Sequence, residues 1–175
     1  MKSRPPSPTK PARRPPAFRV HRSAIHGRGV FAAIAFSPGD RIGEYRGRRI
    51  NHAEMLRRFR ARPGEFGHTF FFIVDDDVII DAGERGNGIR YMNHSCAPNC
   101  VTAIEEGRVF VYALRDIAPG EELAYDYLLQ PGDPAEALVD YVCACGAANC
   151  RGTMVDPAEL PASVRRAARR LVRRE

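Results

Sequence analysis

The middle of the chain carries a dense run of hydrogen-bonding residues, Arg90-Tyr91-Met92-Asn93-His94-Ser95-Cys96-Ala97-Pro98-Asn99-Cys100. It lies between two regions that are expected to form strands, so it is either a surface loop or a functional site. His94 beside Ser95 and Cys96 would suit nucleophilic catalysis, but adjacent residues rarely align as nucleophile and base. The chemistry of this run therefore depends on what the rest of the chain places beside it.

The cysteines are the second group of candidate functional residues. The chain has five, of which Cys143, Cys145 and Cys150 fall within eight residues. Disulfides are disfavoured in an intracellular protein, so clustered thiols indicate a metal or catalysis. A tetrahedral zinc site needs four ligands, and the fourth would be Cys96, Cys100 or a histidine. The alternative is that a turn-rich segment happens to include cysteine.

A third motif, Gly120-Glu-Glu-Leu-Ala-Tyr-Asp-Tyr127, places Tyr125 and Tyr127 two residues apart. Residues at this spacing point to the same face of an extended strand. Two buried hydroxyls side by side would form the small polar end of a narrow pocket with aromatic walls. The alternative is that both are ordinary core aromatics.

Length and composition predict one β-rich domain with tails. The chain has 175 residues, 44% of them apolar and 27% charged, with 14 prolines and 15 glycines, which suits one globular domain rather than two. Proline-glycine turns are expected at 37–40 and 118–121, and one helix at His52–Arg60. The predicted strands are Phe18–Val20, Gly29–Ile34, Arg41–Tyr45, Thr69–Val74, Val78–Asp81, Arg108–Leu114 and Leu123–Tyr125.

The charge is unevenly distributed. Residues 1–22 carry +7, residues 157–175 carry +4, and the segment 23–156 between them carries −5. Nucleic-acid binding is therefore predicted only for the tails, whereas the body favours a cationic ligand, to which Asp75–Asp77 would contribute unless it is a solvated turn. Residues 1–16 are expected to be a disordered, proline-rich arm, which is either a tether or a solvated tail. Residues 156–175 are expected to form a basic amphipathic helix, packed on the domain rather than bound to a membrane or nucleic acid.

Taken together, these motifs resemble the SET-domain family of protein-lysine N-methyltransferases, followed by a cysteine-rich post-SET element. The family's motifs are matched in order by residues 26–31, 43–47, 90–100, 120–127 and 143–152. The resemblance implies a mostly β (β-rich α+β) SET fold over 17–130, with small sheets and a knot-like C-terminal crossing. It also implies a zinc-binding post-SET segment over 131–155. Zinc would be bound by Cys96, Cys143, Cys145 and Cys150, leaving Cys100 free.

The resemblance also implies the reaction and its residues. S-adenosylmethionine would lie against the turn of Gly27 and Gly29, and the cofactor-binding set would be His26, Gly27, Arg28, Gly29, Arg90, Asn93, His94 and Tyr127. The target lysine would enter a channel lined by Tyr45, Tyr125 and Tyr127, with Tyr127 as the catalytic tyrosine. A tyrosine at position 125 implies mainly mono- or dimethylation.

The implied partner is a basic protein substrate such as a histone or histone-like protein, with nucleic-acid contact through the basic tails. No run approaches the ~18 apolar residues of a membrane span, and the N-terminus does not resemble a secretory signal. We therefore expect an intracellular protein, in the cytoplasm or with the nucleoid or nucleus, which leaves export as an effector open. The alternative function is a non-enzymatic SET-like binding module whose tails hold nucleic acid. A dinucleotide-binding domain is disfavoured, because Gly83, Gly86 and Gly88 have the wrong order for that fingerprint.

Overall fold

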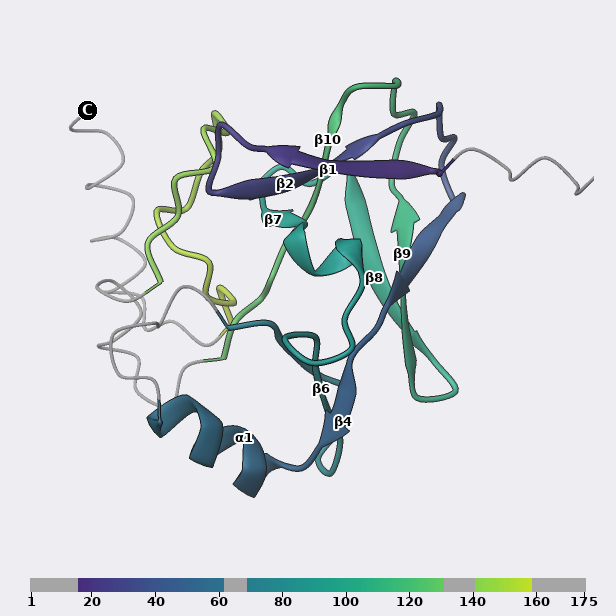
Figure 1. Cartoon of the computed structure of the whole chain (residues 1–175). Coiled ribbons are helices and arrows are strands. Elements are labelled where there is room, and N and C mark those ends of the chain that lie inside the picture. The colour runs from purple at the N-terminus through teal and green to yellow at the C-terminus, as the bar shows by residue number, and fades with distance from the viewer. Residues whose placement is uncertain (1–15, 62–68, 131–140, 159–175) are drawn as a thin grey trace, which may run out of the picture.

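Three small β-sheets form the framework of the computed structural model, which describes residues 16–61, 69–130 and 141–158 (Figure 1). The elements are β1 (Phe18–Arg22), β2 (Arg28–Ala32), β3 (Arg41–Tyr45), β4 (Arg48–Ile50), α1 (His52–Arg60), β5 (Phe71–Ile73), β6 (Ile79–Asp81), the 3-10 helix η1 (Gly88–Tyr91), β7 (Asn93–His94), β8 (Cys100–Glu105), β9 (Arg108–Ala113) and β10 (Glu122–Tyr125). The prediction of a mostly β fold with small sheets is confirmed.

The sheets bring distant segments together. Their strand orders are β1-β2-β10-β7, β3-β9-β8 and β4-β6-β5. Strand β10 runs antiparallel to β2 and parallel to β7, with Ala124 opposite Asn93 and Tyr125 opposite His94. The two polar motifs predicted from the sequence therefore lie side by side. The chain leaving β10 stays against the Asn93 segment, since Tyr127 hydrogen-bonds to both Met92 and His94.

One apolar core joins the three sheets. Its members come from all of them and from η1, and the fully buried ones include Val30, Ile89, Val109, Val111 and Leu123. Val30 and Leu123 are directly opposed across β2 and β10. Burying a side chain of this size contributes about 1.5–3 kcal/mol, so the core fixes β10 between its neighbours and with it the position of the tyrosines that follow.

Local sequence explains the turns and the helix. Gly39 and Gly120 both have φ near +85 to +89°, the left-handed geometry that the third residue of a type II turn requires, which confirms the predicted turns at 37–40 and 118–121. The prediction of a helix over His52–Arg60 is also confirmed. The Asn51 side chain accepts a hydrogen bond from the Glu54 N–H at 2.9 Å, which satisfies one of the free donors at the helix start.

Three strands were not predicted: β4, β7 and β8. Strand β8 pairs with β9 through a two-residue turn, Glu106-Gly107, in which both residues have positive φ. Such a turn matches the twist of the two strands in a hairpin, so this dipeptide could have been used to predict the β8–β9 hairpin from the sequence. The short strands β4 and β7 have no period of their own to detect. They are strands because β6 and β10 pair with them.

The arm at 1–15 and most of the predicted C-terminal helix at 156–175 lie outside the described residues. So do residues 131–140 of the predicted post-SET segment. Within the described ranges, no helix has both the length and the apolar character that crossing a membrane requires.

Candidate active site and metal centre

A cavity of about 650 Å³ opens between the β1–β2 turn, the end of β10 and helix α1. Among the residues predicted for the site, its lining includes His26, Gly27, Arg28, Tyr45, Arg90, Asn93, Tyr125 and Tyr127. Gly29 and His94 are not among the lining residues. The predicted cofactor turn and the predicted lysine channel therefore open into one space, with Met55 and Phe59 of α1 on its wall.

The turn between β1 and β2 is anchored by the carboxylate of Glu122. Glu122 accepts hydrogen bonds from the Ser23 hydroxyl at 2.8 and 2.9 Å and from the Asn93 amide at 2.8 Å. The same Asn93 amide lies 3.3 Å from the His26 carbonyl and 3.2 Å from the Arg28 carbonyl. Asn93 thus joins β7, β10 and the turn, which fixes the backbone that lines the cavity.

Gly29 makes room for the Glu122 carboxylate and does not line the cavity. A β-carbon at position 29 would lie 2.2 Å from Glu122 Oε1 and 3.0 Å from the Ser23 β-carbon. Only a glycine lets the carboxylate approach the strand this closely. Gly27, by contrast, has φ +47° with no atom within 4 Å of an added β-carbon, so its requirement is conformational.

Arg90 brings a positive charge to the cavity wall. Its Nη1 donates to the Ala82 carbonyl at 2.8 Å and its Nη2 to the Tyr91 hydroxyl at 2.7 Å. Its Nε is buried and has no partner among the described residues. Because a buried unpaired donor is costly, this nitrogen is suited to an anionic or carbonyl acceptor on a bound molecule.

Three tyrosines, Tyr45, Tyr125 and Tyr127, line the same cavity. Tyr45 donates to the Phe70 carbonyl at 2.9 Å, and Tyr127 donates to the Met92 carbonyl at 2.6 Å. The Tyr125 hydroxyl makes no such bond to any described residue, and its ring centre lies 4.9 Å from that of Tyr127. Burial raises the pKa of all three hydroxyls above the ordinary value, so they are neutral at physiological pH. The described residues lining this cavity include no carboxylate.

Four of the five cysteines converge beside the cavity. The sulfur atoms of Cys96, Cys143, Cys145 and Cys150 all lie within 4.8 Å of one another. Backbone N–H groups point at them: Arg151 N lies 3.4 Å from Cys96 Sγ, and Cys96 N lies 3.4 Å from Cys145 Sγ. Donors aimed at sulfur stabilise thiolates, and hydrogen bonding from Cys143 and His94 lowers the pKa of Cys96 to about 3. The cluster has the ligand number and type of a closed metal site.

Cys100 stands apart from this cluster. It is the first residue of β8, is fully buried, and donates to the Asn99 side-chain oxygen at 3.3 Å. Burial raises the pKa of its thiol to about 12, so it stays protonated and is a poor metal ligand.

His94 connects the cysteine cluster to Tyr127, the predicted catalytic tyrosine. Its Nε2 lies 3.3 Å from Cys96 Sγ, while its Nδ1 accepts the Tyr127 backbone N–H at 3.1 Å. With Nδ1 accepting, the ring proton sits on Nε2 and points at the sulfur. The side chain is buried, and its Nδ1 also lies 3.5 Å from Asp126 Oδ1. Its contact with a cofactor stays a prediction.

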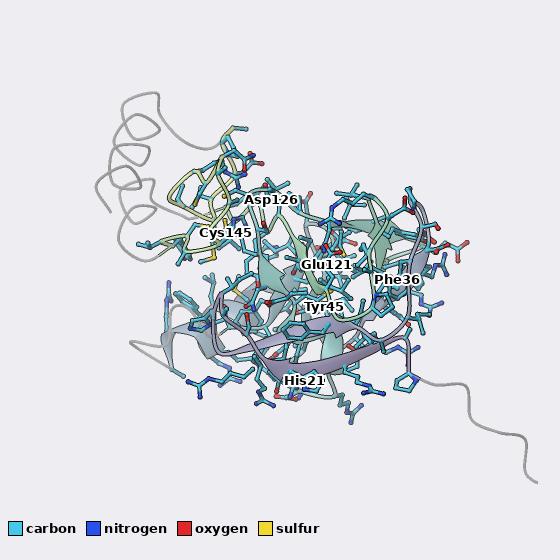
Figure 2. All side chains as sticks on the ribbon, turned by 90° about the horizontal axis from the view of Figure 1, so that it is seen from above. His21, Phe36, Tyr45, Glu121, Asp126 and Cys145 are labelled. Carbon is cyan, nitrogen blue, oxygen red and sulfur yellow. The ribbon has the colours of Figure 1, made fainter. Side chains whose placement is uncertain are left out.

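An ion pair makes a second connection between the cysteine segment, residues 141–158, and the residues that follow β10. Arg151 binds the Asp126 carboxylate through both terminal nitrogens, at 2.7 and 2.8 Å. Figure 2 shows Asp126 and Cys145 on the side of the molecule where the cysteine segment packs. That segment also brings Tyr141 and Met154 to the cavity wall. Folding of the cysteine segment and completion of the cavity are therefore linked.

Sequence reasoning missed the supporting roles of Glu122, Asp126 and Arg151. Glu122 and Asp126 lie within motifs recognised from the sequence, yet their spacing gives no sign of a partner. Those partners are distant in sequence: Ser23 for Glu122, and Arg151 for Asp126.

Comparison with known proteins matches residues 27–128 to the SET domain family. A histone-lysine N-methyltransferase, H3 lysine-4 specific, from Schizosaccharomyces pombe is 43% identical over 137 residues, covering 74% of this chain and 14% of that protein. The protein with the same description from Saccharomyces cerevisiae is 40% identical over 137 residues, covering 75% and 12%. Human histone-lysine N-methyltransferase 2B is 39% identical over 139 residues, covering 77% and 5%.

Solved structures agree with the sequence comparison. A Polycomb Repressive Complex 2 structure, described as ctPRC2 in an autoinhibited conformation bound to S-adenosylmethionine, matches with a TM-score of 0.59 and 31% identity. The match covers 63% of this chain and 15% of that one. The chain thus spans only about a twentieth to a seventh of the length of the relatives compared above.

Proposed function

Because the chain belongs to the SET domain family, we propose that it transfers methyl groups from S-adenosylmethionine to the ε-amine of lysine in a protein substrate. One observation carries this proposal: a single cavity joins a glycine turn, anchored by Asn93 and Glu122, to three buried neutral tyrosines. A binding module without catalysis would not require this assembly.

The residues on the cavity wall fit the proposed methyl donor. The unpaired Arg90 Nε–H is suited to its carboxylate end, and the absence of a β-carbon at Gly27 permits close approach of the backbone. Glu122 adds a negative charge beneath the same turn, which favours a cationic ligand. S-adenosylmethionine would supply the methyl group on an electrophilic sulfonium.

The tyrosines would orient the reacting groups rather than move protons. The Tyr127 hydrogen is committed to the Met92 carbonyl, so its oxygen is left as an acceptor. Since no carboxylate lines the described cavity, the substrate ammonium would lose its proton to solvent, helped by the neighbouring sulfonium charge. Alignment of this kind can supply about 7–11 kcal/mol of barrier lowering.

We further propose that zinc occupies the site formed by Cys96, Cys143, Cys145 and Cys150. The four sulfurs, within 4.8 Å of one another, match the ligand set of a structural zinc site. In this chain the metal would tie the cysteine segment to Cys96, and so hold His94 and Tyr127 in their positions relative to each other.

A histone or histone-like protein is the proposed substrate class, supported by the names of the relatives and by the net charge of −5 over 23–156. Mainly mono- or dimethyllysine is the proposed product. Nucleic-acid contact of the basic tails and an intracellular location remain predictions.

The decisive experiment is incubation with methyl-labelled S-adenosylmethionine and a histone H3 peptide, followed by mass spectrometry of the peptide. We expect labelled lysine. Asn93→Ala should lose both cofactor binding, measured by calorimetry, and turnover. Cofactor binding without transfer to any lysine peptide or basic protein would favour the binding module instead.

A further inference from the structure

The distribution of lysine in this chain is extreme. Of 27 Lys and Arg residues only two are lysines, Lys2 and Lys10, and both lie within the first ten residues. From residue 11 onward, every one of these Lys and Arg residues is arginine. The folded body therefore presents no lysine at all, while the basic arm ahead of β1 presents two.

From this distribution, together with the cavity, we propose that the chain methylates its own arm at Lys10. The inference rests on the proposed function and names a substrate for that site. Arginine cannot replace lysine as acceptor there, because the guanidinium stays protonated in proteins, whereas an amine loses its proton when it is desolvated near a positive charge.

The cavity suits an amine acceptor. Two of its three tyrosine hydroxyls are committed to the Phe70 and Met92 carbonyls. The third, on Tyr125, has no partner among the described residues and is available to an incoming Nζ. The aromatic walls from Phe70 and Phe72 would cover the apolar stem of a lysine.

Lys10 is the better acceptor of the two. It precedes Pro11, and a proline disfavours helical backbone angles at the residue before it. The nearby Arg13 and Arg14 complement the −5 charge of residues 23–156. Lys2 is followed by Ser3 rather than proline and has one arginine nearby, Arg4.

The transfer balances without a further reactant. The Lys10 ammonium first releases a proton to solvent. The free Nζ lone pair then forms the new N–C bond while the sulfur–methyl bond breaks, and its electron pair stays on sulfur, leaving a neutral thioether. The methyl donor is the one that the proposed function supplies.

The test is incubation of the full chain with methyl-labelled S-adenosylmethionine and no other protein, followed by intact-mass and peptide mass spectrometry. We expect methyllysine at Lys10, lost at least tenfold in Lys10→Arg and kept in the matched variant Lys2→Arg. Both variants should methylate an added histone H3 peptide at the wild-type rate. The dependence of the labelling rate on protein concentration then assigns donor and acceptor to one chain or to two.

Two results would overturn the inference while leaving the proposed function intact: labelling that persists in Lys10→Arg, or no self-labelling by chain that methylates the H3 peptide. Absence of transfer to both the arm and every added substrate, despite cofactor binding, would instead refute the proposed function itself.

Discussion

Replacing Tyr125 by phenylalanine tests how the cavity limits methylation. Its side chain is buried and lines the cavity, and its hydroxyl makes no hydrogen bond to a described residue, unlike the hydroxyls of Tyr45 and Tyr127. It is therefore free to bind the substrate amine, or to hold a water molecule that a methylated amine must displace. We expect Tyr125→Phe to shift the product from mono- and dimethyllysine toward trimethyllysine.

The magnitude follows from the hydrogen bond that is removed. One such bond contributes about 0.5–1.5 kcal/mol net, which corresponds to a change of up to about tenfold in the ratio of successive methylation rates. The stability of the fold should be unchanged or slightly higher, because the variant loses a hydroxyl on the cavity wall that had no partner among the described residues.

Tyr45→Phe is the matched control. It removes a hydroxyl that donates to the Phe70 carbonyl at 2.9 Å and leaves that carbonyl without its donor. We expect a loss of about 1–3 kcal/mol in the free energy of unfolding, seen as a melting temperature lower by several degrees.

Mass spectra of a methylated peptide over time, with melting curves of both variants, give the result. Predominant trimethylation by the unmodified chain would refute the reasoning. So would an unchanged product ratio in Tyr125→Phe, or a stability loss in Tyr125→Phe as large as that in Tyr45→Phe.

Four further predictions follow from the site. Tyr127→Phe should reduce methyl transfer at least a hundredfold while S-adenosylmethionine affinity changes less than threefold, because the hydroxyl acts at the reacting atoms; wild-type turnover would contradict its role. Cys96→Ser should lose zinc, measured by elemental analysis, whereas Cys100→Ser should keep it; the opposite result would show that Cys100, and not Cys96, is the fourth ligand. Gly29→Ala should force the Glu122 carboxylate from its place, lowering stability by about 1–3 kcal/mol and weakening cofactor binding in calorimetry; wild-type values for both would contradict the support role of this contact. The rate should rise with pH between 7 and 9 as the substrate amine deprotonates, without a falling limb from tyrosine, because the raised pKa of Tyr127 keeps its hydroxyl protonated over that range; a bell-shaped profile would contradict this.

Much of the fold could be predicted because its signals are local. The turns at 37–40 and 118–121 and the helix His52–Arg60 depend on residues next to one another, and proline, glycine and a capping asparagine act within one turn. The fold class and the cysteine cluster could also be inferred, since the order of motifs along the chain is itself a sequence property. Strands β4 and β7 could not, because each exists only through its partner.

The sequence alone determined which chemical groups are available: the four clustering thiols, the pair of tyrosines two residues apart, and a body without lysine. Tertiary structure decided what each group does. It turned the His94 ring toward Cys96 and the Tyr127 amide, set the Glu122 carboxylate under Gly29, and left only the Tyr125 hydroxyl of the three without a described partner. These outcomes depend on which backbone atoms from distant segments lie within about 3 Å, and local propensity does not specify that distance.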